Sequence, residues 1–396
     1  MGHYGANEEF CVRMKSIIQR VILGMGVILT VILAASCKHQ NTGSEGIRQF
    51  SYRGLVASDK PVTEKVDTWL DAMSREDKIG QLMMISLHGT ELGGQSQRDV
   101  IRKYRVGGIL LTNENLMYKN QVKAFIEEIH QTAVTSSLVT PYIAINRDKV
   151  ERRGGDIFLR LPEASKMGQY SIDRIINLTT RSAIELRDMG FNLVIGPNAN
   201  LGGAAYFLYG GPTWAGHINL AMAERYQINH MWFAYNYFPP SLGTGDRMFS
   251  SADETKDYLS DNDVAVFKRL VKQTTPNTYM VIVSHAQFPA IDSEHLASSS
   301  KSIITDWLRS DLGYDGIIMT DRIDVGALQS NQNIGDYAVA SVLAGSDIIL
   351  LDADTMHIDE VHRALSRAVE NGDISEERLN ASVRRILSMK MQEHAD

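Results

Sequence analysis

Eight short apolar runs, separated by segments of helical periodicity, constrain the fold of this chain more than any other feature of its sequence. One of them, residues 191–197, is apolar except for Asn192, which is typical of a strand buried on both faces of a parallel sheet. Eight such strands alternating with helices predict an α/β fold, a single-domain (β/α)8 TIM-like barrel. A doubly wound open sheet is the alternative, because strand periodicity does not show closure. The expected strands lie at residues 82–87, 107–112, 141–146, 191–197, 231–237, 280–284, 316–320 and 347–351.

The composition excludes several classes of function. The net charge is −7 and no basic stripe is present, so nucleic acid is not an expected partner. No Gly-x-Gly-x-x-Gly or Walker sequence follows a strand, and the 11 histidines show no metal-ligand spacing. We therefore expect neither a cofactor nor a metal. Both cysteines, Cys11 and Cys37, precede the expected barrel, which leaves that domain without a thiol nucleophile.

The N-terminal residues have the pattern of a targeting segment. Lys15 and Arg20 precede a nearly unbroken apolar run at residues 21–35, which has the length of a signal-peptide core and is short for a membrane span. The run leads into Leu33-Ala-Ala-Ser-Cys37, which resembles the lipobox of bacterial lipoproteins, in which the cysteine is lipidated. A signal anchor that is never cleaved is the alternative.

These features divide the chain into three expected parts. Residues 1–37 form a signal peptide with a lipobox, residues 38–65 a polar tether, and residues 66–391 the barrel. The lipobox implies a lipid anchor, and hence a membrane partner. We expect the protein in the bacterial cell envelope, on the periplasmic side or at the cell surface.

Polar side chains follow the expected strands, where the active sites of barrels form. Amides, a phenol and an imidazole in a ring suit a ligand rich in hydroxyl groups, although polar loops occur at this end of any barrel. The candidate ligand-binding residues are Asn146, Asn200, Asn236, Tyr237 and His285.

The carboxylate that ends the seventh expected strand is the first candidate for chemistry. Asp321 directly follows the apolar run 316–320 and precedes a stretch with helical residues. Two interpretations are open, since an aspartate in this place either acts on a ligand or caps the following helix.

Several segments, in order along the chain, resemble the barrel domain of glycoside hydrolase family 3. The resemblance covers residues 66–390, and the most similar branch is that of the single-domain bacterial β-N-acetylglucosaminidases. The similar segments are Lys78-Ile-Gly-Gln-Leu-Met-Met84, Val106-Gly-Gly-Ile-Leu110, residues 185–192, the stretch 313–328 that contains Asp321, residues 343–351 and residues 374–387.

The resemblance implies a retaining glycoside hydrolase without a cofactor. One aspartate attacks the anomeric carbon while a second group gives a proton to the leaving oxygen. The position of the family's nucleophile corresponds to Asp321. The implied activity is that of a β-N-acetylhexosaminidase on the O-glycosidic bonds of cell-envelope or host amino sugars, with a carbohydrate as substrate or ligand.

The chain departs from the family pattern at several positions. Asn146 and Asn200 stand where the family has aspartates, and Asn236-Tyr-Phe-Pro-Pro replaces Lys-His-Phe-Pro-Gly. The family's Asp-Ser-His acid/base pair is expected within residues 245–263, which contain no histidine. The same segment holds six carboxylates as alternative proton donors: Asp246, Asp253, Glu254, Asp257, Asp261 and Asp263.

Two functions remain open at this stage. The first is a family 3 hydrolase with impaired activity, because general acid catalysis contributes on the order of 10² to 10⁴ in rate. The second is a catalytically inactive lipoprotein that binds a sugar or a protein at the barrel mouth. A barrel chemistry that uses new acids from residues 245–263 is a third idea without further support.

Overall fold

The computed structural model describes residues 51–93, 95–135, 139–147, 157–159, 161–162, 164–199, 211–240, 263–275 and 277–392. The expected signal peptide 1–37, with its lipidation site Cys37, lies outside these residues, as do Asn200 and the acidic segment up to residue 262. None of the helices in the described ranges has the length and hydrophobicity needed to cross a bilayer.

The chain divides into two compact units after Lys60. In the first unit the described residues form helix α2 (Tyr52–Val56), in which the Ser51 hydroxyl accepts a hydrogen bond of 3.1 Å from the amide of Gly54. The second unit begins with α3 (Val62–Ala72), which buries Val66 and Leu70. Since α2 and the start of α3 fall within residues 38–65, the expected tether is wrong in its described part.

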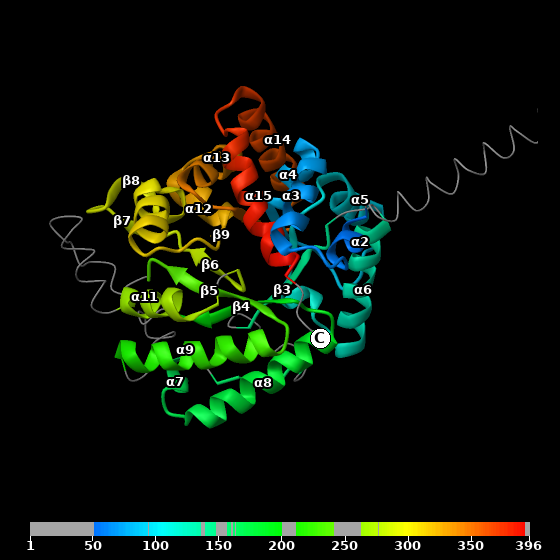
Figure 1. Ribbon diagram of the computed structural model, residues 1–396. Coiled ribbons are helices and arrows are strands. Elements are labelled where there is room, and N and C mark those ends of the chain that lie inside the picture. The colour runs from blue at the N-terminus through cyan, green and yellow to red at the C-terminus, as the bar shows by residue number, and fades with distance from the viewer. Residues whose placement is uncertain are drawn as a thin grey trace, which may run out of the picture. The chain divides into compact units, whose positions relative to one another are not determined.

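The second unit is a closed barrel of parallel strands (Figure 1). The order around the barrel is β1-β10-β9-β6-β5-β4-β3-β2, so the first strand pairs with the last. All eight expected strands are confirmed, and closure excludes the open sheet. The strands are β1 (Met83–Ser86), β2 (Gly108–Leu111), β3 (Tyr142–Asn146), β4 (Leu193–Asn198), β5 (Trp232–Phe238), β6 (Tyr279–Val283), β9 (Ile317–Arg322) and β10 (Ile348–Leu351).

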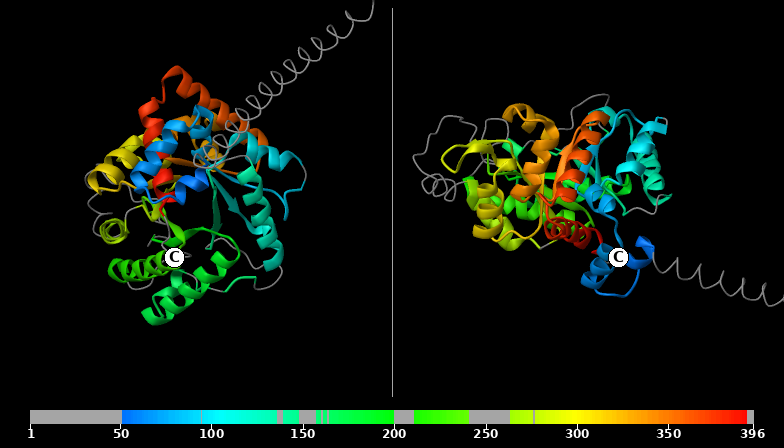
Figure 2. Two further views of the ribbon diagram at one scale, coloured as in Figure 1. Left: turned by 45° about the vertical axis from the view of Figure 1, so that its right-hand side comes forward. Right: turned by 90° about the horizontal axis from the view of Figure 1, so that it is seen from above.

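Helices cover the outside of the strands (Figures 1 and 2). A hairpin of β7 (Gln287–Phe288) and β8 (Asp292–Leu296) after β6 was not expected from the sequence. The helices are α4 (Arg75–Gln81), α5 (Gln95–Tyr104), α6 (Lys119–Thr135), α7 (Ala164–Met167), α8 (Ile172–Asp188), α9 (Gly211–Ile228), α11 (Asp263–Gln273), α12 (Ile323–Ser330), α13 (Ile334–Ala344), α14 (Thr355–Asn371) and α15 (Glu376–Lys390), with 3-10 turns η1 (Asn113–Asn115) and η2 (Ala297–Ser299) and a π-helix η3 (Ser302–Asp311).

Two glycines interlock the start of the barrel. The amide of Gly107 donates to the carbonyl oxygens of both Gly80 and Met83, at 2.9 Å each. A Cβ at Gly107 would lie 2.2 Å from the carbonyl oxygen of Gln81, and one at Gly80 would lie 2.1 Å from that of Tyr104. These backbones therefore approach each other at distances that only glycine permits.

We expect Gly107→Ala to lower the free energy of unfolding by about 1–3 kcal/mol, because the new methyl group meets backbone and not a movable side chain. The measurement is urea unfolding followed by circular dichroism. Gly93→Ala is the matched control, since the nearest atom to its Cβ is 3.9 Å away. Equal stability of the two variants would contradict the interlock.

A buried carboxylate holds the N-terminal end of β10. Asp347 is 0% exposed and lies 2.5 Å from Arg309, 3.4 Å from Arg385 and 3.6 Å from Arg378. The hydroxyl of Ser382 and the amide of Ile318 also donate to it, at 2.5 and 3.0 Å. Burial tends to raise the pKa of Asp347, but the three guanidinium groups outweigh it and hold the pKa below its usual range.

The last helix closes the same end of the barrel. The buried Lys390 ammonium donates to Gln81 Oε1 at 2.9 Å and to the Gly107 carbonyl at 2.7 Å, and lies over the Tyr142 ring. Burial lowers the pKa of Lys390 well below its usual range. Helix α15 also packs against α3, so segments far apart in the sequence lie side by side at the barrel base (Figure 1).

Candidate active site

The C-terminal ends of the strands bring the predicted residues to one mouth of the barrel. Asn146 is the last residue of β3, Asn236 lies near the end of β5, and Asp321 near the end of β9. Because all strands of the barrel are parallel, these ends face the same side. Asp347 and Lys390 lie at the opposite end, so the base carries the stabilising charge cluster and the mouth carries the predicted site.

Asp321 is half-buried, and its carboxylate makes few interactions with the described residues. Its Oδ1 accepts one hydrogen bond of 2.9 Å from the amide of Arg322. The Arg322 guanidinium instead pairs with Asp324, Nε to Oδ1 at 3.0 Å and Nη2 to Oδ2 at 2.5 Å. Among the described residues no cation pairs directly with Asp321.

The capping interpretation of Asp321 is wrong. The residue at the N-cap of α12 is Arg322, and its side chain makes no capping hydrogen bond with the first turn. The Asp321 carboxylate bonds the amide of its immediate neighbour, which is not the geometry of a cap, since a cap bonds an amide two or three residues further on.

His285 follows β6 and contacts the residue next to Asp321. Its Nε2 lies 2.8 Å from the carbonyl oxygen of Arg322, and its Nδ1 lies 2.6 Å from the Ser298 hydroxyl. The Ser298 hydroxyl lies 2.6 Å from the hydroxyl of Tyr337 on α13. Both ring nitrogens therefore have hydrogen-bond partners inside the protein, and one of these partners is the backbone carbonyl of Arg322. The predicted contact between His285 and a sugar stays a prediction.

Asn236 offers an unsatisfied acceptor at the end of β5. Tyr235 points out of the barrel, because its hydroxyl lies 3.3 Å from that of Thr274, just after α11. By the alternation of a strand Asn236 then points inward. Asn236 is 2% exposed, and its Oδ1 has no hydrogen-bond partner among the residues that the structure describes. An orphaned buried acceptor costs about 1–3 kcal/mol, which fits a group kept for a ligand hydroxyl.

The remaining predicted residues lie at strand ends or outside the described residues. Asn146 and Tyr237 are half-buried at the ends of their strands, and Asn236 pairs in register with Asn198 of β4. Asn200 lies outside the described residues. The acidic segment 245–263 does too, except that residue 263 begins α11.

Two carboxylate–imidazole pairs follow the strands on either side of β9. Asp292 and His295 lie 3.1 Å apart in β8, and Asp352 and His357 lie 3.1 Å apart after β10. Burial tends to raise the pKa of Asp292, but hydrogen bonds from the Ser300 hydroxyl, two backbone amides and His295 outweigh it and lower the pKa. Asp292 is thus committed to closing a turn. In the described ranges no group of three or more acidic, histidine or cysteine side chains is placed to hold a metal ion.

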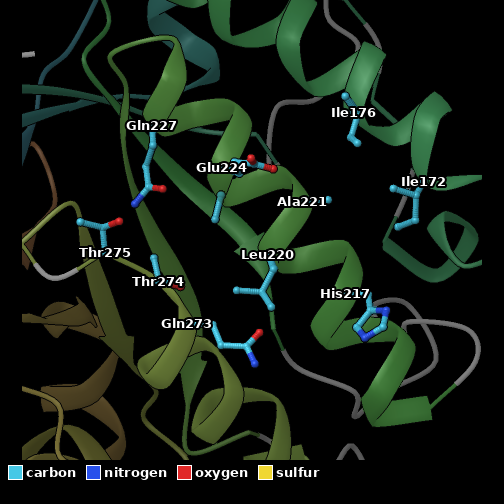
Figure 3. Close-up of a pocket in the computed structure, with 11 residues that line it drawn as sticks. Ile172, Ile176, His217, Leu220, Ala221, Glu224, Gln227, Gln273, Thr274 and Thr275 are labelled. Carbon is cyan, nitrogen blue, oxygen red and sulfur yellow. The ribbon is translucent and has the colours of Figure 1, made fainter. Parts of the chain in front are cut away.

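A groove on the outside of the barrel lies away from the predicted residues. It has a volume of about 600 Å³ and runs along α9, between α8 and the end of α11 (Figure 3). Its lining includes Ile172, His217, Glu224, Gln227, Gln273 and Thr275. It contains none of the residues predicted from the strand ends, and we do not assign it to the active site.

Sequence reasoning missed the residues that surround His285. Ser298 lies 13 positions away in the chain and Tyr337 lies 52 positions away, and neither belongs to a recognisable motif. A third residue, Gly326 of α12, leaves room for the imidazole ring. The only signal in the sequence was that Gly326 lies in the segment that contains Asp321.

Comparisons with known proteins find relatives of this chain. Residues 74–389 match the glycosyl hydrolase family 3 N-terminal domain. A β-hexosaminidase A of Pseudoalteromonas piscicida is 26% identical over 74% of this chain and 54% of its own length. A β-hexosaminidase of Chromobacterium violaceum is 24% identical over 72% of this chain and 82% of its own.

Solved structures show the same barrel. The structure of a glycoside hydrolase family 3 β-N-acetylglucosaminidase from a Paenibacillus species superposes with a TM-score of 0.72 at 26% identity, over 80% of this chain and 62% of that one. The chain therefore spans about half of the length of the Pseudoalteromonas relative and under two thirds of the Paenibacillus protein. With four fifths of its residues matched to the family's barrel domain, the chain belongs to glycosyl hydrolase family 3.

Proposed function

We propose that the protein is a retaining glycoside hydrolase of the β-N-acetylhexosaminidase type, with Asp321 as its nucleophile. The observation that carries the proposal is the Asp321 carboxylate, which stands at the end of β9 with only one backbone hydrogen bond and no direct ion pair among the described residues. The names of the similar proteins, β-hexosaminidases and β-N-acetylglucosaminidases, support the substrate class.

In the proposed reaction the Asp321 carboxylate attacks the anomeric carbon, and the bond to the leaving oxygen breaks with its electron pair. A water molecule then attacks the same carbon, gives up one proton to the solvent and releases Asp321 as a carboxylate, so that the sugar keeps its β configuration. The buried Asn236 amide would accept a hydrogen bond from a sugar hydroxyl and hold the ring over Asp321.

We propose further that the step that protonates the leaving group is impaired. The supporting observation is the segment 245–263, which has no histidine where the family places its Asp-Ser-His pair. A carboxyl group in water has a pKa near 4 and is therefore a poor proton donor at neutral pH, so the six carboxylates of this segment do not by themselves replace the missing histidine.

We therefore expect a steep dependence on the leaving group. The 4-nitrophenyl N-acetyl-β-glucosaminide, whose phenolate leaves without a proton, should exceed the disaccharide of β-linked N-acetylglucosamine in kcat/KM by about 10² to 10⁴. The assay measures both substrates at pH 7 with the same preparation. Similar values for the two would contradict impaired acid catalysis, and turnover of neither would contradict the hydrolase.

The Asn236 geometry also favours a second candidate function, a sugar-binding protein without turnover. Its unsatisfied buried oxygen serves binding as well as catalysis. Saturable binding of N-acetylglucosamine by calorimetry, weakened in Asn236→Ala and accompanied by no hydrolysis, would favour this candidate.

We also propose that Cys37 carries a lipid that anchors the protein in the bacterial cell envelope. The support is the lipobox-like sequence that ends at Cys37. Cys37→Ser should abolish incorporation of labelled fatty acid and move the protein out of the membrane fraction. Unchanged labelling of the variant would contradict this assignment.

A further inference from the structure

We propose that His285 is a positioning residue that holds the backbone beside Asp321 through a directed chain of hydrogen bonds. The chain runs from the Tyr337 hydroxyl to Ser298, to the imidazole, and to the carbonyl of Arg322. The kinetic part of this inference rests on the proposed hydrolase function, whereas the structural part does not.

The donor-to-acceptor direction of this hydrogen-bond chain follows from its last group, the carbonyl of Arg322. The carbonyl oxygen of Arg322 can only accept, so His285 Nε2 carries the proton across the 2.8 Å contact. In the neutral ring Nδ1 is then an acceptor, and the Ser298 hydroxyl donates to it at 2.6 Å. The Ser298 oxygen in turn accepts from Tyr337. Every donor therefore points toward Arg322, and the tautomer of His285 is fixed by its surroundings.

Burial excludes water from the start of this hydrogen-bond chain. Ser298 and Tyr337 are 0% exposed, so water does not compete for their hydroxyl groups. Burial also raises the pKa of Tyr337, which keeps its hydroxyl protonated as the first donor. An imidazole placed against buried hydroxyls in this way has one orientation, and that orientation is passed on to the backbone it bonds.

Helix α12 is shaped to admit the ring. A Cβ at Gly326 would lie 2.7 Å from both Cε1 and Nδ1 of His285 and 2.6 Å from the Tyr337 ring. The helix that starts directly after Asp321 and Arg322 therefore passes over the imidazole at a distance that only glycine allows. His285 is clamped between this helix and Ser298.

One residue then links the clamp to the nucleophile. The carbonyl of Arg322 is held by His285, and the amide of Arg322 donates to the Asp321 carboxylate at 2.9 Å. A rotation of this residue would move both groups. His285 thus sets the direction of the carboxylate through Arg322 without touching the sugar.

The test combines hydrogen exchange with kinetics on the full chain. In His285→Ala, exchange of the backbone amides at residues 319–328 should be about tenfold faster, because the segment opens locally. The matched control is His295→Ala, whose imidazole pairs with Asp292 on the hairpin after the same strand and should leave residues 319–328 at the wild-type rate. Ser298→Ala should show a smaller increase and serves if His285→Ala does not fold.

With 4-nitrophenyl N-acetyl-β-glucosaminide, His285→Ala should lose about 10- to 100-fold in kcat with KM nearly unchanged, as misplacing a catalytic group does. His285→Gln, which keeps a donor for the Arg322 carbonyl, should recover part of the loss. Unchanged exchange at 319–328 would overturn the proposal whether or not the wild type hydrolyses the substrate, as would faster exchange with an unchanged kcat in an active enzyme. Faster exchange together with an inactive wild type would support the structural clamp and overturn only the hydrolase function.

Discussion

Asp321→Asn is expected to lower kcat on 4-nitrophenyl N-acetyl-β-glucosaminide by about 10³-fold or more, since removal of a hydrolase nucleophile typically costs at least this much. The amide keeps the size of the side chain but cannot form the glycosyl ester. The Asp321 carboxylate has no direct ion pair among the described residues, so the substitution does not deprive a buried cation of its partner. The thermal midpoint should therefore change little while turnover disappears.

The stereochemistry of a rescue experiment sharpens this prediction. Asp321→Ala makes room for a small external nucleophile, and added azide should restore turnover and give the α-glycosyl azide by a single inversion. The control is Asp336→Asn, which removes an exposed carboxylate in the first turn of α13 and should keep wild-type kinetics. A β-azide, or full activity of Asp321→Asn, would exclude Asp321 as the nucleophile.

Asp347→Asn is expected to lower the free energy of unfolding by about 3–5 kcal/mol, the range for removing one partner of a buried ion pair. The variant leaves Arg309, Arg378 and Arg385 close together without the carboxylate that they share. The measurement is the urea unfolding curve at pH 7. Asp315→Asn is the matched control, because Asp315 also binds Arg385 but its side chain is 92% exposed, and its removal should cost below about 1 kcal/mol.

The same carboxylate predicts a pH dependence. The folded pKa of Asp347 is lowered relative to the unfolded value of about 3.9. Its stabilisation is therefore fully present above pH 3.9 and is lost as the pH falls through the lower folded pKa. The stability difference between wild type and Asp347→Asn should be constant from pH 7 to about pH 5 and shrink only in stronger acid. A difference that shrinks near pH 6 would point to a histidine instead.

Much of the barrel was predictable because its strands are buried on both faces. Strand β10 is apolar throughout and β4 is apolar up to its last residue, Asn198. Both stand between helices, so the order and number of the strands could be predicted, with ends displaced by one or two residues. The β7–β8 hairpin was missed because strands of two and five residues carry too little periodicity.

The site was predictable only where one residue at a strand end carries the chemistry. Asp321 directly follows an apolar run and could be identified from local sequence. The surroundings of His285 could not, since Ser298 and Tyr337 come together with it only through tertiary packing. Asn236 was predicted from the sequence as a polar group at a strand end, but only the structure shows that its side-chain oxygen lacks a hydrogen-bond partner among the described residues.

The closure of the barrel has a consequence for how the protein reaches its native state. Strand β1 pairs with β10, which closes the barrel. At the base, Lys390 near the C-terminus hydrogen-bonds Gln81 and Gly107 near the first two strands. A ribosome-bound chain that lacks β10 therefore exposes open strand edges on β1 and β9, which can pair with strands of other chains. Closure of the barrel must therefore wait until β10 has been synthesised.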